Sequence, residues 1–121
     1  MRLCTEKNQL VLGEIEWSEF ADKWPNIFIR RSEQIRNGHV LFLASLHNPT
    51  TIFAQISLLY HLPKYLCRSL KILLPYFPTG TMERIQIQGE IATAYSLAQM
   101  LSSVPLTRSG PPEIVIFDIH A

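Results

Sequence analysis

Two short segments of the chain combine residue types that bind nucleotides or metals. Residues 74–84 run from an apolar stretch into a Pro-Thr-Gly-Thr turn that ends on two charged residues. Residues 117–121 follow a second apolar stretch and include Asp118 and His120, an acid and an imidazole two positions apart. Parallel strands that end in polar residues place them at one edge of the sheet, where α/β proteins bind nucleotides and metals. The two segments therefore predict a phosphate or nucleotide site.

Each part of this site has a plainer alternative. Asp118 and His120 would lie on the same side of a strand end, where they can hold Mg²⁺ on a nucleotide or move a proton. A hydrogen-bonded strand terminus would show the same pair. The turn at residues 78–81 offers N–H groups and hydroxyls to an anion, but it lacks the G-x-x-x-x-G-K-[ST] pattern, and an ordinary tight turn is the alternative. Three charged residues nearby are either ligands or part of a solvated loop: Glu83, Arg84 and Glu90.

A second group of candidates lies near the amino terminus. Phe20, Asp22, Trp24 and Asn26 combine flat rings with hydrogen-bonding groups around a turn, as a nucleobase pocket requires. Aromatic lids over a core are the alternative interpretation. Three histidines have no partners at ligand spacing and are expected at the surface, a strand start or a helix end: His39, His47 and His61.

The composition is that of a globular chain of one domain. Of its 121 residues, 47% are hydrophobic and 17% charged, which excludes a disordered chain. The net charge is +1 and the basic residues are scattered, so no nucleic-acid or anionic-membrane partner is indicated. No apolar run approaches the ~20 residues of a membrane span. Cys4 and Cys67 lack metal-ligand spacing, so we expect reduced thiols and a cytoplasmic or organellar-matrix location.

The strands that must position these residues are short apolar runs. Residues 40–44, 70–77 and 114–119 are apolar on both faces, which is typical of parallel strands covered by helices on both sides. Residues 11–20 and 27–29 read as further strands, which would add an antiparallel edge or a flap.

Two helices are predicted between the buried strands. The first covers residues 50–61, with Asn48 as N-cap and Pro49 in the first turn, and the second covers residues 89–102. The strand–helix alternation predicts an α/β fold, a three-layer sandwich with a parallel sheet at its core and right-handed connections. The faces expected to be buried are Ile52, Phe53, Ile56, Leu59 and Tyr60 in the first helix, and Ile91, Ala94, Tyr95, Ala98 and Leu101 in the second.

Taken together, these segments resemble the amino-terminal domain of the ribose-phosphate pyrophosphokinases, most closely the plant-type, class II form. The resemblance extends from about Ile15 to Ala121 and is strongest at residues 24–29, 74–84, 91–94 and 117–121. It implies a single phosphoribosyltransferase-like domain over residues 1–121, truncated at both ends. The family's first strand and helix would be missing or replaced, and its second domain would lie beyond Ala121.

The resemblance implies transfer of the β,γ-diphosphoryl group of ATP to ribose 5-phosphate, with Mg²⁺ as cofactor and catalysis by positioning and charge stabilisation. It implies that the loop after an early strand contacts adenine, and that the loop at residues 81–84 approaches the phosphates. The implied ATP site comprises Phe20, Asp22, Thr81, Met82, Glu83 and Arg84, and the implied metal site comprises Asp118 and His120. No catalytic residue is expected within the chain itself.

Three departures from the family pattern bear on function. Thr81-Met82 stands where class I enzymes carry Arg-Gln, and Lys23 stands where the adenine loop usually has glycine. Acidic residues of the plant-type loop are replaced at residues 86–88, which removes negative charge near the metal.

Three hypotheses follow from this pattern. The first is the ATP-site half of the enzyme, inactive alone, which would bind ATP, meet ribose 5-phosphate only through the missing second domain, and form homo-oligomers. The second is a non-catalytic regulatory or oligomerisation subunit, which the loss of acidic residues favours slightly. The third is a general nucleotide-fold binding module, which the two specific motifs disfavour.

Overall fold

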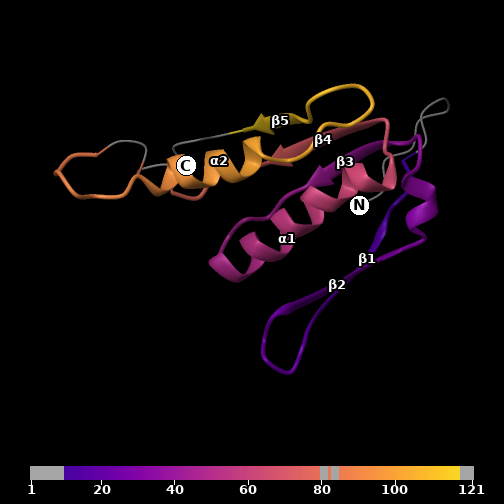
Figure 1. Ribbon diagram of the computed structural model, residues 1–121, viewed down its shortest axis with the longest axis horizontal. Coiled ribbons are helices and arrows are strands. Elements are labelled where there is room, and N and C mark those ends of the chain that lie inside the picture. Colours follow the sequence, from indigo (N-terminus) through magenta and orange to yellow (C-terminus); the bar gives the residue numbers. More distant parts are fainter. Residues whose placement is uncertain (1–9, 80–81, 83–84, 118–121) are drawn as a thin grey trace. The chain divides into compact units, whose positions relative to one another are not determined.

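A computed structural model of the chain describes residues 10–79, 82 and 85–117. The chain divides into two compact units, Met1–Ser32 and Glu33–Ala121. The first contains a two-stranded antiparallel sheet, and the second contains a three-stranded parallel sheet with its helices (Figure 1). The predicted α/β class with a parallel core is therefore confirmed. The amino-terminal strands pair only with each other and are not an edge of the parallel sheet.

All five predicted strands and both predicted helices are present, with small shifts at their ends. Short 3₁₀ turns at Ser32–Ile35 and Leu62–Tyr65 accompany them. None of the helices in the described part of the chain is long and apolar enough to cross a membrane. In chain order, the elements are β1 (Glu14–Glu19), β2 (Pro25–Arg30), β3 (His39–Leu43), α1 (Pro49–His61), β4 (Ser69–Leu74), α2 (Thr93–Ser102) and β5 (Glu113–Ile116).

Helix α1 begins where the capping residues predicted it would. The Asn48 side chain accepts a hydrogen bond from the backbone N–H of Thr51 at 3.0 Å, and the Thr51 hydroxyl accepts one from the Asn48 N–H at 3.3 Å. Pro49 occupies the first helical position, where its missing N–H costs nothing. The reciprocal pair satisfies two donors that the helix itself cannot, so the start of α1 is set by local sequence.

Helix α2 begins four residues later than predicted. Gly89 has a φ of +100°, which is outside the helical region. The Glu90 carboxylate accepts hydrogen bonds from the backbone N–H groups of Gln86 at 3.0 Å and Ile87 at 3.2 Å. These bonds close a turn that the helix cannot include. Ala92, the N-cap of α2, makes no side-chain capping bond. The sequence therefore contained no capping pattern from which the start of α2 could be predicted.

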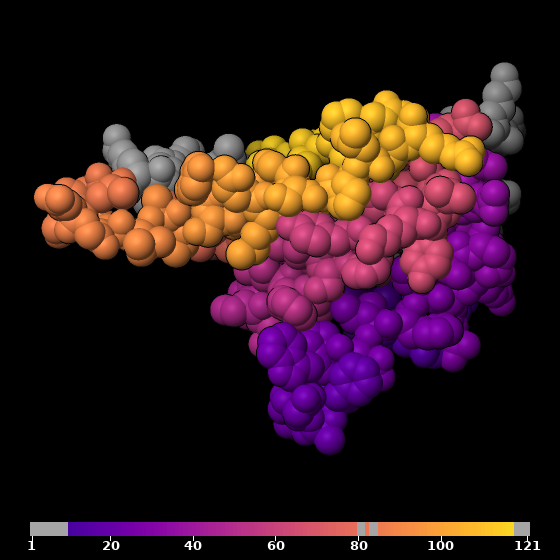
Figure 2. Space-filling view, in the orientation of Figure 1, coloured from indigo at the N-terminus to yellow at the C-terminus, as the bar shows by residue number. Residues whose placement is uncertain are grey.

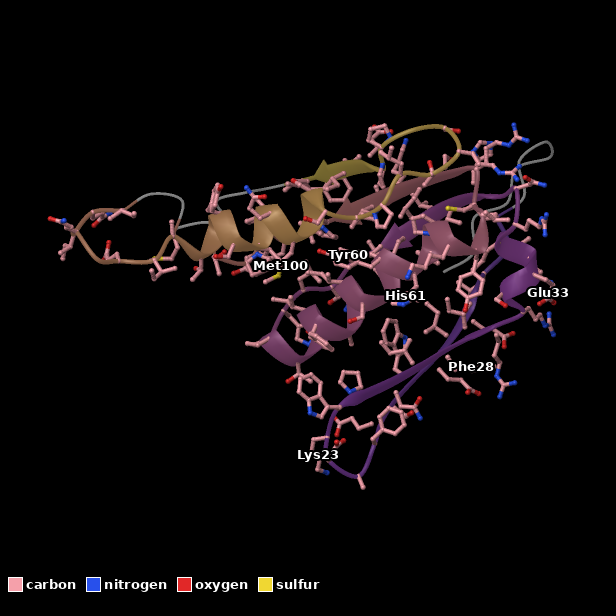
Figure 3. The ribbon with its side chains drawn as sticks, viewed as in Figure 1. Lys23, Phe28, Glu33, Tyr60, His61 and Met100 are labelled. Carbon is pink, nitrogen blue, oxygen red and sulfur yellow. The ribbon has the colours of Figure 1, made fainter. Side chains whose placement is uncertain are left out.

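Both helices pack on the same face of the parallel sheet. The strand order is β3–β4–β5, and Leu70, Ile72 and Leu74 of β4 are at most 2% exposed on the covered face. The Tyr60 hydroxyl of α1 donates a hydrogen bond to the Met100 carbonyl of α2 at 2.6 Å, so the helices are neighbours (Figures 2 and 3). Two crossovers of the same hand that advance in the same direction place their helices on one face.

Neither α1 nor α2 covers the opposite face of the parallel sheet. Leu41 and Leu43 of β3 are 51% and 66% exposed. The expected helix cover of residues 40–44 is therefore seen on one face only, because both described helices lie there. Apolar content on both faces does not reveal which face the connections will cover, because that depends on the strand order.

The buried helix faces also differ in part from the prediction. Leu58 and Leu97 are buried although the periodicity did not select them. Phe53, Ile91 and Tyr95 were expected in the core but are 51%, 69% and 65% exposed. The remaining buried positions of the helices are Ile56, Leu59, Ala94 and Leu101, all as predicted. Ala98, also expected in the core, is exposed.

Candidate functional site

The carboxyl ends of the three parallel strands meet at one edge of the sheet. Leu43 pairs with Leu73 across β3 and β4, and Leu74 pairs with Ile116 across β4 and β5. The backbone N–H of Phe117 donates to the Leu74 carbonyl at 3.3 Å, so the pairing continues past the end of β5. The segments that carry the two sequence motifs therefore leave the sheet side by side, at the edge where α/β proteins bind ligands.

The loop after β4 contains a residue in an unusual conformation. Thr79 has a φ of +63°, in the left-handed region, which is uncommon for a β-branched side chain. Its Oγ1 is buried and has no hydrogen-bond partner among the described residues. The Thr79 carbonyl accepts a hydrogen bond from the Met82 N–H at 2.8 Å, which folds the loop back on itself. Strained backbone and unsatisfied polar atoms concentrate at functional sites, so this loop is the strongest candidate.

Only part of the predicted phosphate loop lies within the described residues. Met82 is half-buried, and its carbonyl accepts a hydrogen bond from the Ala94 N–H at 3.3 Å, which ties the loop to the first turn of α2. Thr81, Glu83 and Arg84 lie outside the described residues.

Asp118 and His120 follow directly after Phe117 but also lie outside the described residues. Their assignment as a metal site therefore stays a prediction. Within the described ranges, no three His, Cys, Asp or Glu side chains are grouped so that they could hold a metal ion. Glu90, a further candidate, uses its carboxylate to accept the backbone bonds of its own loop.

The loop after β3 reaches the same edge and was not selected from the sequence. The Gln55 side chain accepts a hydrogen bond from the Ser45 N–H at 2.9 Å and donates one to the Ser45 carbonyl at 3.0 Å. Nδ1 of His47 lies 3.1 Å from both the hydroxyl and the carbonyl of Ser45. A glutamine ten residues away gives no local signal, which is why sequence reasoning missed this arrangement. His47 itself was expected at the surface and is exposed.

The adenine candidates lie in the other unit, at the tip of the β1–β2 hairpin. The backbone N–H of Lys23 donates to the Phe20 carbonyl at 2.9 Å, and the Phe20 N–H donates to the Trp24 carbonyl at 2.8 Å. Asp22 Oδ1 accepts from the Trp24 N–H at 3.3 Å. Lys23, at the tip in Figure 3, has a φ of +73°. This conformation favours glycine, which agrees with the glycine that the family pattern has at this position.

Cys67 is not suited to chemistry. It is 0% exposed, and burial raises the pKa of its thiol above the ordinary value of 9.0. The thiolate form needed for nucleophilic attack or metal binding is therefore disfavoured.

Comparison with known proteins identifies the chain's relatives. No protein-family model matches the sequence. It is 47% identical to the chloroplastic ribose-phosphate pyrophosphokinase 3 of Oryza sativa subsp. japonica over 99% of this chain and 29% of the relative. The mitochondrial pyrophosphokinase 3 of Spinacia oleracea is also 47% identical, over 99% of this chain and 30% of the relative. Ribose-phosphate pyrophosphokinase 4 of Arabidopsis thaliana is 44% identical over 98% of this chain and 35% of the relative.

The chain is homologous to one domain of the ribose-phosphate pyrophosphokinases. The match fits the amino-terminal domain that the sequence motifs indicated, and it spans about a third or less of the length of these relatives. The crystal structure of phosphoribosylpyrophosphate synthetase from Mycobacterium smegmatis superimposes with a TM-score of 0.69, over 93% of this chain and 36% of that chain. At 20% identity, this likeness supports the fold alone.

Proposed function

We propose that this chain forms the ATP-binding half of a ribose-phosphate pyrophosphokinase and is inactive by itself. The parent reaction would transfer the β,γ-diphosphoryl group of ATP to the anomeric hydroxyl of ribose 5-phosphate and release AMP. The observation that carries the proposal is the 47% identity over 99% of the chain to an enzyme named for this reaction. The chain spans 29% of the length of that enzyme.

In this proposal, the carboxyl edge of the parallel sheet receives the triphosphate. Backbone N–H groups of the loop at residues 81–84, with the Arg84 guanidinium, would bind the phosphate oxygens. The buried Thr79 hydroxyl, which has no partner among the described residues, would gain one when the nucleotide binds. Phe20 would stack on adenine, and Asp22 would accept a hydrogen bond from it.

Mg²⁺ would be held by Asp118 and His120 together with the nucleotide. One carboxylate and one imidazole are too few ligands for this ion, which prefers six oxygen ligands and keeps several waters. The donor set therefore fits a metal that arrives bound to phosphate oxygens. When bound, the ion would screen the phosphate charge.

We also propose that the parent acts as a homo-oligomer, in a compartment that keeps Cys67 reduced. The relatives named above include chloroplastic and mitochondrial enzymes, so the matrix of either organelle is as consistent with this as the cytoplasm.

A second candidate function is a non-catalytic subunit that binds and modulates full-length enzymes. The loop at residues 85–90 supports it, because Ile87 is 69% exposed at one of the positions, residues 86–88, where the family pattern has acidic residues near the metal. An apolar loop of this kind suits contact with another protein better than contact with a metal–nucleotide complex.

Calorimetric titration with Mg-ATP tests the leading proposal. We expect saturable binding that His120→Ala weakens about tenfold, or about 1.4 kcal/mol, because a ligand to the metal–nucleotide complex is lost. His61→Ala is the matched control, since Nδ1 of His61 lies 2.7 Å from the Ser57 carbonyl of its own helix. With ribose 5-phosphate added, no AMP should form.

Two outcomes would contradict the leading proposal: AMP release in proportion to the chain, or Mg-ATP affinity that His120→Ala leaves unchanged. Mixing the chain with an active full-length relative distinguishes the second candidate. A change in that enzyme's rate without Mg-ATP binding by the chain would favour the non-catalytic subunit.

A further inference from the structure

The loop between β3 and α1, residues 44–48, is fixed at both of its ends. The backbone N–H of Ala44 donates to the Leu73 carbonyl at 2.8 Å, so the pairing with β4 continues past the end of β3. Leu46 packs in the core and is 2% exposed. The capping box described above fixes the start of α1. The loop therefore leaves the carboxyl edge of the sheet in a conformation that both of its neighbouring elements determine.

Burial alternates along this loop. Ala44 and Leu46 lie in the core, and the two residues that alternate with them, Ser45 and His47, are exposed. Gln55 of α1 fixes the main chain of Ser45, because its side chain accepts from the Ser45 N–H at 2.9 Å and donates to the Ser45 carbonyl at 3.0 Å. A helix side chain therefore determines the position of Ser45.

The His47 ring is held through one of its nitrogens. Nδ1 lies 3.1 Å from the Ser45 carbonyl, which can only accept, and 3.1 Å from the Ser45 hydroxyl, which can also donate. Nδ1 therefore has a partner with or without a proton, so Nε2 can carry a proton in both the neutral and the charged ring. Nε2 has no hydrogen-bond partner among the described residues. The ring thus presents an oriented donor.

His47 differs from the other two described histidines in its place on the sheet. His39 begins β3 and His61 is the last residue of α1, so both lie towards the amino edge, to which α1 returns. The loop of His47 leaves the carboxyl edge beside the loop after β4, which contains Thr79. Ligands of α/β proteins bind at this carboxyl edge.

We propose that His47 contacts phosphate at the carboxyl edge, where Nε2 donates to a phosphate oxygen of the nucleotide, and that Gln55 is its positioning residue. The inference rests on the proposed function for the identity of the ligand. An anion is favoured over a metal ion, because the positive end of the α1 dipole follows directly after His47. The described ranges also contain no group of three metal-ligating side chains.

Titration calorimetry with two probes tests the role of His47. Mg-ATP is the whole proposed ligand, and inorganic tripolyphosphate is its phosphate chain alone. His47→Ala should weaken the binding of both about tenfold, because a hydrogen bond to a charged group is lost. His47→Gln, whose amide nitrogen can also donate, should weaken it less.

His61→Ala is the matched control. Nδ1 of His61 lies 2.7 Å from the Ser57 carbonyl, so this ring is held in the same way at the other end of α1. The substitution should change either affinity less than about twofold.

A double-mutant cycle tests whether Gln55 acts through His47. Gln55→Leu removes both bonds to Ser45 and should weaken tripolyphosphate binding about threefold. In a His47→Ala background, the same substitution should weaken it no further. An equal loss in both backgrounds would show that Gln55 does not position His47.

Nitrogen NMR of the imidazole rings gives a readout other than affinity. The chain has four histidines, and the Nε2 signal that His47→Gln removes belongs to His47. Saturating tripolyphosphate should shift this signal and leave those of His39 and His61 in place. A His47 signal that tripolyphosphate does not shift would overturn the proposal.

The remaining outcomes separate this inference from the proposed function. Mg-ATP binding that His120→Ala weakens and His47→Ala does not would overturn the role of His47 and leave the proposed function intact. Tripolyphosphate binding that depends on His47, in a chain that does not bind Mg-ATP, would support the role of His47 and contradict the proposed function. The absence of saturable binding of either probe would overturn both.

Discussion

At the scale of single residues, Thr79 combines backbone strain with an unpaired buried hydroxyl. Left-handed φ costs an L-residue with a Cβ roughly 1–2 kcal/mol, and a buried unsatisfied oxygen adds to that cost. Both costs are tolerable if the conformation serves a bound ligand.

We therefore predict opposite effects on stability and on binding for Thr79→Gly. Removing the side chain should raise the free energy of unfolding by about 1 kcal/mol, because glycine adopts this φ freely and the orphan hydroxyl is gone. Mg-ATP affinity should fall. Urea unfolding and calorimetry measure the two effects.

The control is Thr50→Gly, in the first turn of α1. It should lower the free energy of unfolding by about 0.5–1 kcal/mol. A Thr79→Gly chain that is less stable, or that binds nucleotide more tightly, would show that Thr79 has only a packing role.

At the scale of elements, the two helices differ in how they begin. Helix α1 starts with two reciprocal capping bonds, and α2 starts at Ala92 with none. Asn48→Ala should lower the free energy of unfolding by about 1 kcal/mol, because both bonds depend on the asparagine side chain or on the geometry that it holds. Urea unfolding followed by helical circular dichroism reports on α1 directly.

Asn26→Ala provides the matched comparison, since the Asn26 side chain is exposed on β2. The Ser18 hydroxyl donates to the Asn26 backbone carbonyl, which the substitution keeps. This substitution should change the free energy of unfolding by less than about 0.5 kcal/mol. Equal effects of the two substitutions would mean that the cap does not stabilise α1.

At the scale of the whole molecule, the β1–β2 hairpin exposes more aromatic surface than a two-stranded sheet can support. Trp17, Phe20, Trp24 and Phe28 are between 48% and 59% exposed, and isolated hairpins are marginally stable in water. We expect the chain to self-associate at tens of micromolar, with a contact at or near Phe20 to Asn26.

Sedimentation velocity measures this association. Phe20→Ser combined with Trp24→Ser should shift the distribution towards the 13.9 kDa monomer, whereas Tyr95→Ser should not. A clean monomer for the unmodified chain would refute the expectation.

The sequence was sufficient for features encoded by neighbouring residues. The apolar runs of β3, β4 and β5, the start of α1 at Asn48, and the placement of both motifs at strand ends all depend on residues close together in the chain. The resemblance rests on such short segments, and the comparisons confirm it. The residues assigned to ATP and metal are known only from that resemblance and stay predictions.

The tertiary structure decided what depends on residues far apart. It placed α1 and α2 on one face, which left Leu41 and Leu43 exposed, because strand order and the hand of the crossovers determine where helices lie. It also delayed the start of α2 and put Thr79 in a left-handed conformation. Hydrophobic periodicity shows which side chains can be buried, but only the packing partners determine which of them are.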